Sequence, residues 1–177
     1  MVAEENIVLE QPEQPAPLSR FNGFLILLVV VGSIIGWIVL GTMLFGLSSF
    51  FATFMFAWCW VNVEQGDFKQ WPQCFIGAIV GVGLTWQSQL LAAQFGTPGL
   101  VTGLLIIIAA IYVQIMNWVP IALNRCAMLF VTVLAAPALL EKMDFVELLA
   151  AIGVGAVYFA IIVKMAVLYA TRKAPMK

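Results

Sequence analysis

The chain has 177 residues, of which 63% are hydrophobic and 10% are charged, and its formal net charge is −1. Soluble globular domains carry about 25% charged residues, so this composition excludes an ordinary soluble domain and predicts a protein of the lipid bilayer. The small net charge, without a basic patch, argues against a nucleic-acid partner.

The chain contains no histidine, and its three cysteines show no CxxC spacing. Histidine is the commonest general base and the commonest metal ligand, so its absence argues against most membrane metalloenzymes. No serine has a base close by in the sequence, and no motif for cofactor attachment occurs. We therefore predict no catalytic residue, no metal and no cofactor.

Residues 1–20 are acidic and contain prolines, and we predict that they form a disordered cytoplasmic tail. A signal peptide begins with positive charge, so the first apolar helix is expected to remain as a membrane span. Residues 21–171 are predicted to form a polytopic transmembrane domain, followed by a basic cytoplasmic tail at 172–177. A bilayer crossing requires roughly 17–25 residues. In chain order, the apolar segments predict helices at 23–45, 48–63, 72–92, 100–118, 121–140 and 145–170.

Two acidic loops divide these segments into similar halves, residues 23–92 and 99–170. The first loop runs from Glu64 to Phe68 and the second from Glu141 to Phe145. Three spans per half is an odd number, so the halves must have opposite orientations in the membrane. The expected fold is an all-α membrane protein of about six transmembrane helices, arranged as an inverted 3+3 repeat with a short second helix in each half.

Within these loops, Asp67 and Asp144 are predicted to be helix N-caps, because Gln or Glu follows each of them three residues later. Glu64 and Glu141 have no such structural explanation. We predict that they are charges at the entrances of a solute pathway.

Positive residues gather on one side of the predicted topology. That side would hold Arg20, Lys69, Arg125, Arg172, Lys173 and Lys177, and the other side only Lys142. By the positive-inside rule, both termini are predicted to be cytoplasmic and the protein to lie in the cell inner (plasma) membrane.

Arg125 is the most informative polar residue, because a charged group inside a span is costly and often functional. Together with Asn124, and with Gln114 and Asn117 from the end of the preceding helix, it would contact a polar solute or an anion. Alternatively, Arg125 lies one turn inside the cytoplasmic interface and extends to lipid headgroups.

Gln87 and Trp58 are two further predicted pathway residues. Gln87 lies deepest among the amides near the end of helix 72–92, and carboxamides suit uncharged polar solutes. A helix end that emerges into interfacial water would explain it as well. Trp58 belongs to the aromatic row of helix 48–63, which either forms a hydrophobic constriction or faces lipid or packs against neighbouring helices.

Several segments resemble the YcdZ-like family of small bacterial inner-membrane proteins of unknown function. They are Phe50–Trp60, Glu64–Lys69, Phe75–Trp86, and Asp144-Phe145 with the following helix that contains Gly153 and Gly155. The resemblance covers about residues 24–168. It implies a polytopic inner-membrane protein and supplies no activity.

The sequence thus predicts a channel or facilitator for a small polar solute or anion, which we expect to be a homo-oligomer in the lipid bilayer. The alternative is a non-transporting structural or accessory subunit of a membrane complex. The two differ in the positions of Gln87, Gln114, Asn124 and Arg125. A pathway requires these residues to converge, whereas an accessory subunit would scatter them.

Overall fold

The computed structural model describes residues 20–136 and 143–173. The tail before Arg20, the end of predicted helix 121–140, Glu141 and Lys142, and residues 174–177 lie outside this description. The chain divides into two units, residues 1–35 and 36–177.

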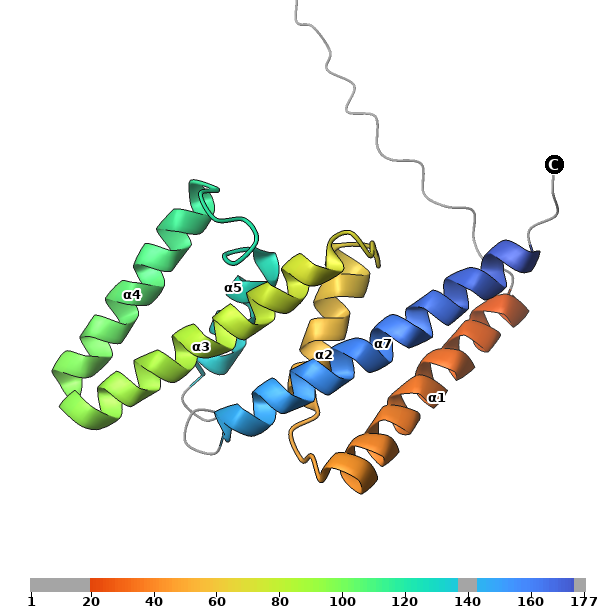
Figure 1. Ribbon diagram of the computed structural model, residues 1–177, viewed down its shortest axis with the longest axis horizontal. Coiled ribbons are helices and arrows are strands. Elements are labelled where there is room, and N and C mark those ends of the chain that lie inside the picture. The colour runs from red at the N-terminus through yellow and green to blue at the C-terminus, as the bar shows by residue number, and fades with distance from the viewer. Residues whose placement is uncertain (1–19, 137–142, 174–177) are drawn as a thin grey trace, which may run out of the picture. The chain divides into compact units, whose positions relative to one another are not determined.

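All regular structure in the described residues is helical (Figure 1). The long helices are α1 (Arg20–Phe45), α3 (Trp71–Phe95), α4 (Thr97–Ile115) and α7 (Phe145–Lys173). The short ones are α2 (Phe51–Trp58), its π-helical continuation η1 (Cys59–Val63) and α5 (Arg125–Leu134). Four segments are long and apolar enough to cross a bilayer, namely Gly23–Phe45, Trp71–Phe95, Thr97–Ile115 and Phe145–Tyr169. The prediction of an all-α chain with apolar helices of membrane length is confirmed.

The second helix of each predicted half is shorter than a bilayer crossing requires. α2 with η1 covers Phe51–Val63, and α5 covers Arg125–Leu134. At 1.5 Å per residue these helices are about 20 and about 15 Å long, whereas the hydrocarbon core is about 30 Å thick. The described part of the chain therefore contains four helices of membrane length, where the sequence predicted about six spans.

α5 begins at Arg125, where the sequence predicted a start at Ile121, because the connection after α4 is irregular. Asn117 has a φ of 54°, which interrupts the helical backbone. Asn124 is extended, and its side-chain oxygen accepts a hydrogen bond from the amide of Ala127 (3.1 Å). This is a typical N-cap arrangement, and it fixes the start of α5.

In the first unit, the described residues form the initial part of α1. The hydroxyl of Ser33 donates to the main-chain oxygen of Val29 one turn earlier (2.8 Å). This bond satisfies the hydroxyl donor within the helix itself, as is common for serine in membrane spans.

In the second unit, α3 packs mainly against α4 and α5, and also against α7. Glycines permit the close approaches. A Cβ at Gly103 of α4 would collide with Ser88 of α3, and a Cβ at Gly81 of α3 would collide with the main chain of Ala127 in α5. These small residues let neighbouring backbones meet, as expected for helices packed in a membrane.

α2 packs on α7 in a similar way. The buried hydroxyl of Thr53 donates to the main-chain oxygen of Ala151 (2.7 Å). Gly155, one turn further along α7, has no side chain and so leaves room for Thr53. A buried hydroxyl is thereby satisfied at the point where the two helices cross.

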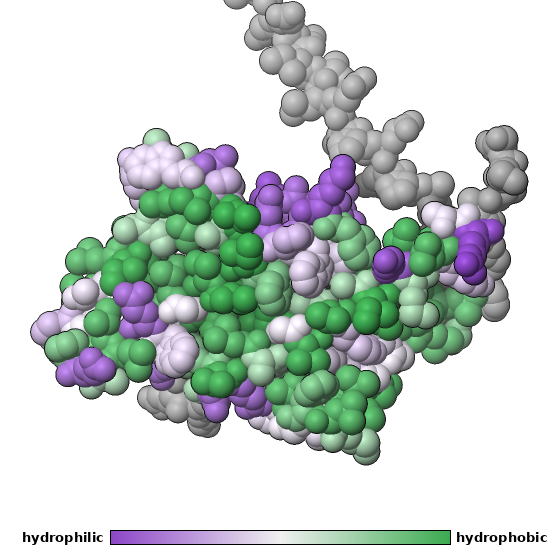
Figure 2. Space-filling model, viewed as in Figure 1, coloured by the Kyte–Doolittle hydropathy of each residue, from purple (hydrophilic) through white to green (hydrophobic). Residues whose placement is uncertain are grey.

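The main core of the second unit lies between α2, η1, α3, α5 and α7. Its largest fully buried side chains are those of Trp60, Phe56, Phe130, Leu134, Leu148 and Ile152. A smaller cluster contains Trp37, Leu47, Ala151 and Phe159. Outside the core, large apolar side chains are exposed along α4 and α7, and apolar residues dominate the face in Figure 2. Exposure on this scale is typical of helices that face lipid.

Candidate functional site: a polar pocket at one end of the helices

A polar pocket of about 280 Å³ lies where η1 ends, α3 begins, α4 ends and α5 begins. It is lined by Glu64, Gln70, Gln73, Gln114, Asn117, Pro120, Leu123, Asn124 and Arg125. The four predicted pathway residues from the second half of the chain, Gln114, Asn117, Asn124 and Arg125, thus line one pocket. Glu64, predicted as an entrance charge, lies in the same pocket.

The end of η1 places Glu64 at the pocket. In this π-helical turn the amide of Glu64 donates to the main-chain oxygen of Cys59 (3.2 Å). Gln65 and Gly66 then adopt positive φ values of 53° and 69°, which end the helix. π-Helical turns widen a helix locally and are frequent at functional sites.

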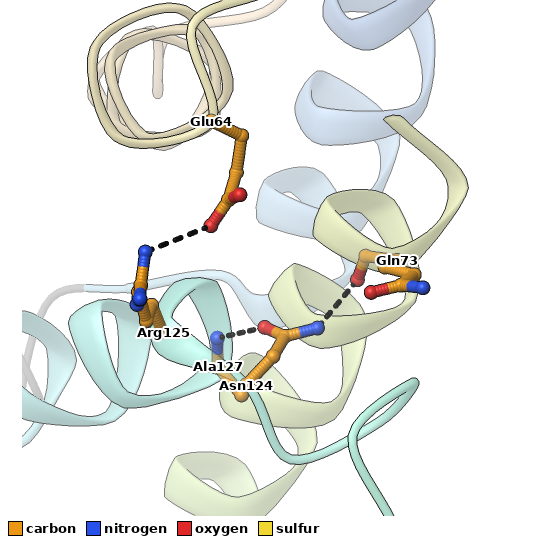
Figure 3. A network of polar contacts seen from close by, with 5 residues as sticks. All are labelled: Glu64, Gln73, Asn124, Arg125 and Ala127. Atoms are coloured by element: carbon orange, nitrogen blue, oxygen red, sulfur yellow. Dashed lines mark hydrogen bonds and ion pairs between the residues drawn. The ribbon is translucent and has the colours of Figure 1, made fainter. Parts of the chain in front are cut away.

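Arg125 and Glu64 form an ion pair across the pocket, with 3.7 Å between Nη1 and Oε1 (Figure 3). The Arg125 side chain is 72% exposed and that of Glu64 is 24% exposed. A pair so accessible to solvent contributes at most about 1 kcal/mol to stability. Arg125 is also the first residue of α5, where the helix dipole disfavours positive charge, so Glu64 offsets an unfavourable position.

Asn124 has a structural role in this pocket. Its side-chain nitrogen donates to the main-chain oxygen of Gln73 in α3 (2.7 Å), and more weakly to that of Ile121 (3.3 Å). Its oxygen caps α5 through Ala127, as Figure 3 shows. Because both the nitrogen and the oxygen of its side-chain carboxamide are hydrogen-bonded, Asn124 shapes the wall of the pocket and fixes α5 against α3.

Gln87 and Trp58 do not belong to this pocket. Gln87 is exposed on α3, far along the helix from Gln73. Trp58 is 55% exposed and lines a separate apolar groove of about 510 Å³ with Phe51, Phe54, Met55 and Leu129. The structure therefore separates these two residues from the other predicted pathway residues.

The two predicted caps differ. Asp144 accepts hydrogen bonds from the amides of Val146 (2.9 Å) and Glu147 (3.2 Å) at the start of α7. The prediction for Asp67 is wrong, because the N-cap position of α3 is Gln70, which makes no side-chain cap. Asp67 instead accepts a hydrogen bond from the amide of Lys69 (2.9 Å) in a turn that precedes the start of α3.

Glu141, predicted as the second entrance charge, lies outside the described residues.

Gln70 and Gln73 line the pocket but were not predicted as site residues. The available signal was their spacing of three at a helix start, which places both side chains on one face. Within the described residues, no group of three or more His, Cys, Asp and Glu side chains is arranged to hold a metal ion. The pocket thus offers carboxamides and one opposite-charge pair, which can bind a solute through hydrogen bonds.

No protein-family model, no curated protein and no solved structure matches this chain.

Proposed function

We propose that the protein facilitates the passage of a small polar solute across the membrane and that the polar pocket is the entrance to the route. The observation that carries the proposal is the convergence of Gln114, Asn117 and Arg125 with Glu64 in one pocket. These residues come from segments far apart in the sequence. Amide-rich, water-accessible pockets are a common basis for solute selectivity in membrane proteins.

The packing supports the proposed inverted repeat. In such a repeat, α2 corresponds to α5 and α3 corresponds to α7, so a contact of α3 with α5 requires an equivalent contact of α7 with α2. Both contacts occur, and α3 also contacts α7, which a two-fold relation permits. Each crossing is built on a glycine of the long helix, Gly77 or Gly81 in α3 and Gly155 in α7. In the proposed arrangement, the short helices α2 and α5 line the route at the junction of the halves.

We further propose that the pocket faces the cytoplasm. The positive-inside rule supports this orientation, because Arg125 lines the pocket and Lys69 directly precedes the lining residue Gln70. In this orientation both termini are cytoplasmic and the protein lies in the inner membrane. Membership of the YcdZ-like type is a separate part of the proposal, and it rests on the resemblance of the sequence segments. Because the protein is small, we expect several copies to assemble around or beside the route.

The charges of the pocket favour neutral solutes. Glu64 and Arg125 compensate each other, so neither an anion nor a cation meets a net opposite charge. A neutral solute with both a donor and an acceptor, such as urea, can bond to the carboxylate, the guanidinium and the surrounding carboxamides. Anions with a strong acceptor, such as formate or nitrite, are expected to pass less well.

Stopped-flow light scattering on proteoliposomes tests the proposal. The panel contains urea, glycerol, formate and nitrite, and compares wild type with Arg125→Ala. Lys69→Ala is the matched control, because Lys69 is exposed near the pocket and does not line it. We expect flux above that of empty liposomes, altered by Arg125→Ala and unchanged by Lys69→Ala. Flux equal to that of empty liposomes for every solute would refute facilitation of this panel.

A non-transporting accessory subunit is the second candidate. The positions of Gln87 and Trp58, both away from the pocket, favour it, because two predicted pathway residues do not converge with the others. In that case the pocket would bind a polar segment of a partner protein. The proteoliposomes would then show no flux, and cross-linking in the membrane would recover a defined partner.

A further inference from the structure

The three cysteines of the chain meet in the core beside the polar pocket. Cys59 begins η1, Cys74 lies in the first turns of α3, and Cys126 lies in the first turn of α5. All three are buried, with exposures of 1%, 3% and 1%, and belong to the same core cluster. Each thiol lies within hydrogen-bonding reach of the other two. Three separate segments therefore bring all the thiols of the chain to one point.

Hydrogen bonds around the cluster fix the positions of the three segments that carry the cysteines. The hydrogen bond from Asn124 to the main-chain oxygen of Gln73 ties the residues that precede Cys126 and Cys74. The amide of Glu64 bonds to the main-chain oxygen of Cys59. Each cysteine is thus adjacent to, or one π-helical turn from, a residue that lines the pocket.

We propose that this cluster is a redox site in which a hydroperoxide oxidises Cys59 and Cys126 to an intramolecular disulfide. The inference does not rest on solute passage. The Cys59 thiolate accepts hydrogen bonds from the thiols of Cys126 and Cys74, which stabilises the nucleophilic form that a purely apolar environment would disfavour. Cys59 and Cys126 are each the leading thiol partner of the other, and they lie on different helices.

The reaction proceeds in two steps that balance. The thiolate attacks one oxygen of the hydroperoxide, the O–O bond breaks, and water or an alcohol leaves, which yields a sulfenic acid. The second thiol attacks the sulfenic sulfur, the S–O bond breaks, and a second water leaves as the disulfide forms. Two electrons pass from sulfur to the peroxide. Cys74 remains reduced beside the new disulfide and is placed to attack it by thiol–disulfide exchange.

Mass spectrometry tests the pairing directly. Trypsin cleaves after Arg20, Lys69, Arg125 and Lys142, so each cysteine falls in its own peptide, 21–69, 70–125 or 126–142. The folded protein in detergent is treated with hydrogen peroxide, blocked with N-ethylmaleimide, unfolded and digested. We expect peptides 21–69 and 126–142 to be joined and peptide 70–125 to carry the maleimide. The same oxidation of the chain unfolded in SDS should be at least about tenfold slower, because the folded state holds the thiols together.

Single substitutions provide the matched comparison. Cys74→Ser should keep the cross-link, whereas Cys126→Ser should abolish it. The wild-type comparison of folded with unfolded chain does not depend on either variant folding. The proposal is overturned by maleimide on all three peptides after oxidation, by cross-links only between chains, by over-oxidised thiols without a cross-link, or by equal rates in the folded and unfolded chain.

Discussion

The side chain of Asn124 joins two helices at the wall of the polar pocket. Its nitrogen donates to the main-chain oxygen of Gln73 at 2.7 Å, while its oxygen accepts from the amide of Ala127 at 3.1 Å. Gly77 makes the arrangement possible, because a side chain there would occupy the space of the Asn124 carboxamide. One residue therefore both starts α5 and sets its distance from α3.

Replacing Asn124 should destabilise the protein. Asn124→Ala removes the cap and the bond to Gln73, which together should lower the free energy of unfolding by about 1–3 kcal/mol. Asn124→Asp keeps a capping oxygen but has no N–H to donate, so its stability should lie between those of the alanine variant and wild type. Unfolding followed by circular dichroism in detergent measures the order. Equal stability of all three proteins would contradict the assigned role.

Gly155 and Gly153 offer a matched test of the contact between α2 and α7. A methyl group at Gly155 would collide with Thr53, whereas one at Gly153 would meet nothing within 4 Å. Gly155→Ala should therefore destabilise the protein by about 1–3 kcal/mol. Gly153→Ala should be neutral or slightly stabilising, because alanine favours helix more than glycine does. Thermal unfolding of the two variants in the same detergent measures this difference in stability. A similar change for both would mean that the crossing adjusts easily.

Local sequence patterns predicted the elements better than their ends. The long apolar runs gave α1, α3, α4 and α7 to within a few residues, because length and hydrophobicity alone determine such helices. Asp67 and Asp144 have the same local pattern, yet only Asp144 bonds to the amides of a helix start. The difference arises from the turn after η1, where Trp60 Nε1 also donates to the main-chain oxygen of Asp67 (2.9 Å). That contact depends on tertiary packing.

The site was predictable only in part, for a similar reason. Asn124 and Arg125 stood out as polar residues at a helix start, and Gln114 and Asn117 as polar residues just before it. The approach of Glu64 to Arg125, and the convergence of Cys59 with Cys126, join segments that are far apart in the chain. No periodicity within one segment encodes such a contact, because it is set by how the helices pack.

Glu147 connects the loop before α2 to the start of α7. Its carboxylate accepts from the amides of Ser48 and Ser49, the latter at 2.9 Å, and from the hydroxyl of Ser48 at 2.9 Å. Glu147→Ala should free both amides, so that their hydrogen exchange accelerates by about tenfold, the effect of losing a bond to a charged acceptor. Glu147→Gln keeps one acceptor oxygen and should show a smaller change. Unaltered exchange at Ser48 and Ser49 in the alanine variant would show that other contacts hold this loop.

The charges of the pocket should control which solutes pass, if the pocket is the entrance. Glu64→Gln leaves Arg125 uncompensated, so formate and nitrite flux should rise relative to urea by about 2- to 5-fold, the effect of one exposed charge. Arg125→Gln leaves Glu64 alone and should lower the same ratio by a similar factor. The double variant is neutral again and should return close to the wild-type ratio.

This design separates charge from shape, because both substitutions retain hydrogen-bonding side chains. Raising the ionic strength should compress the differences among the single variants, since the pair is exposed to solvent and therefore screened. The ratio in wild type and in the double variant should change less. A ratio that is the same in all four proteins would place the solute route away from Glu64 and Arg125, whatever the absolute flux.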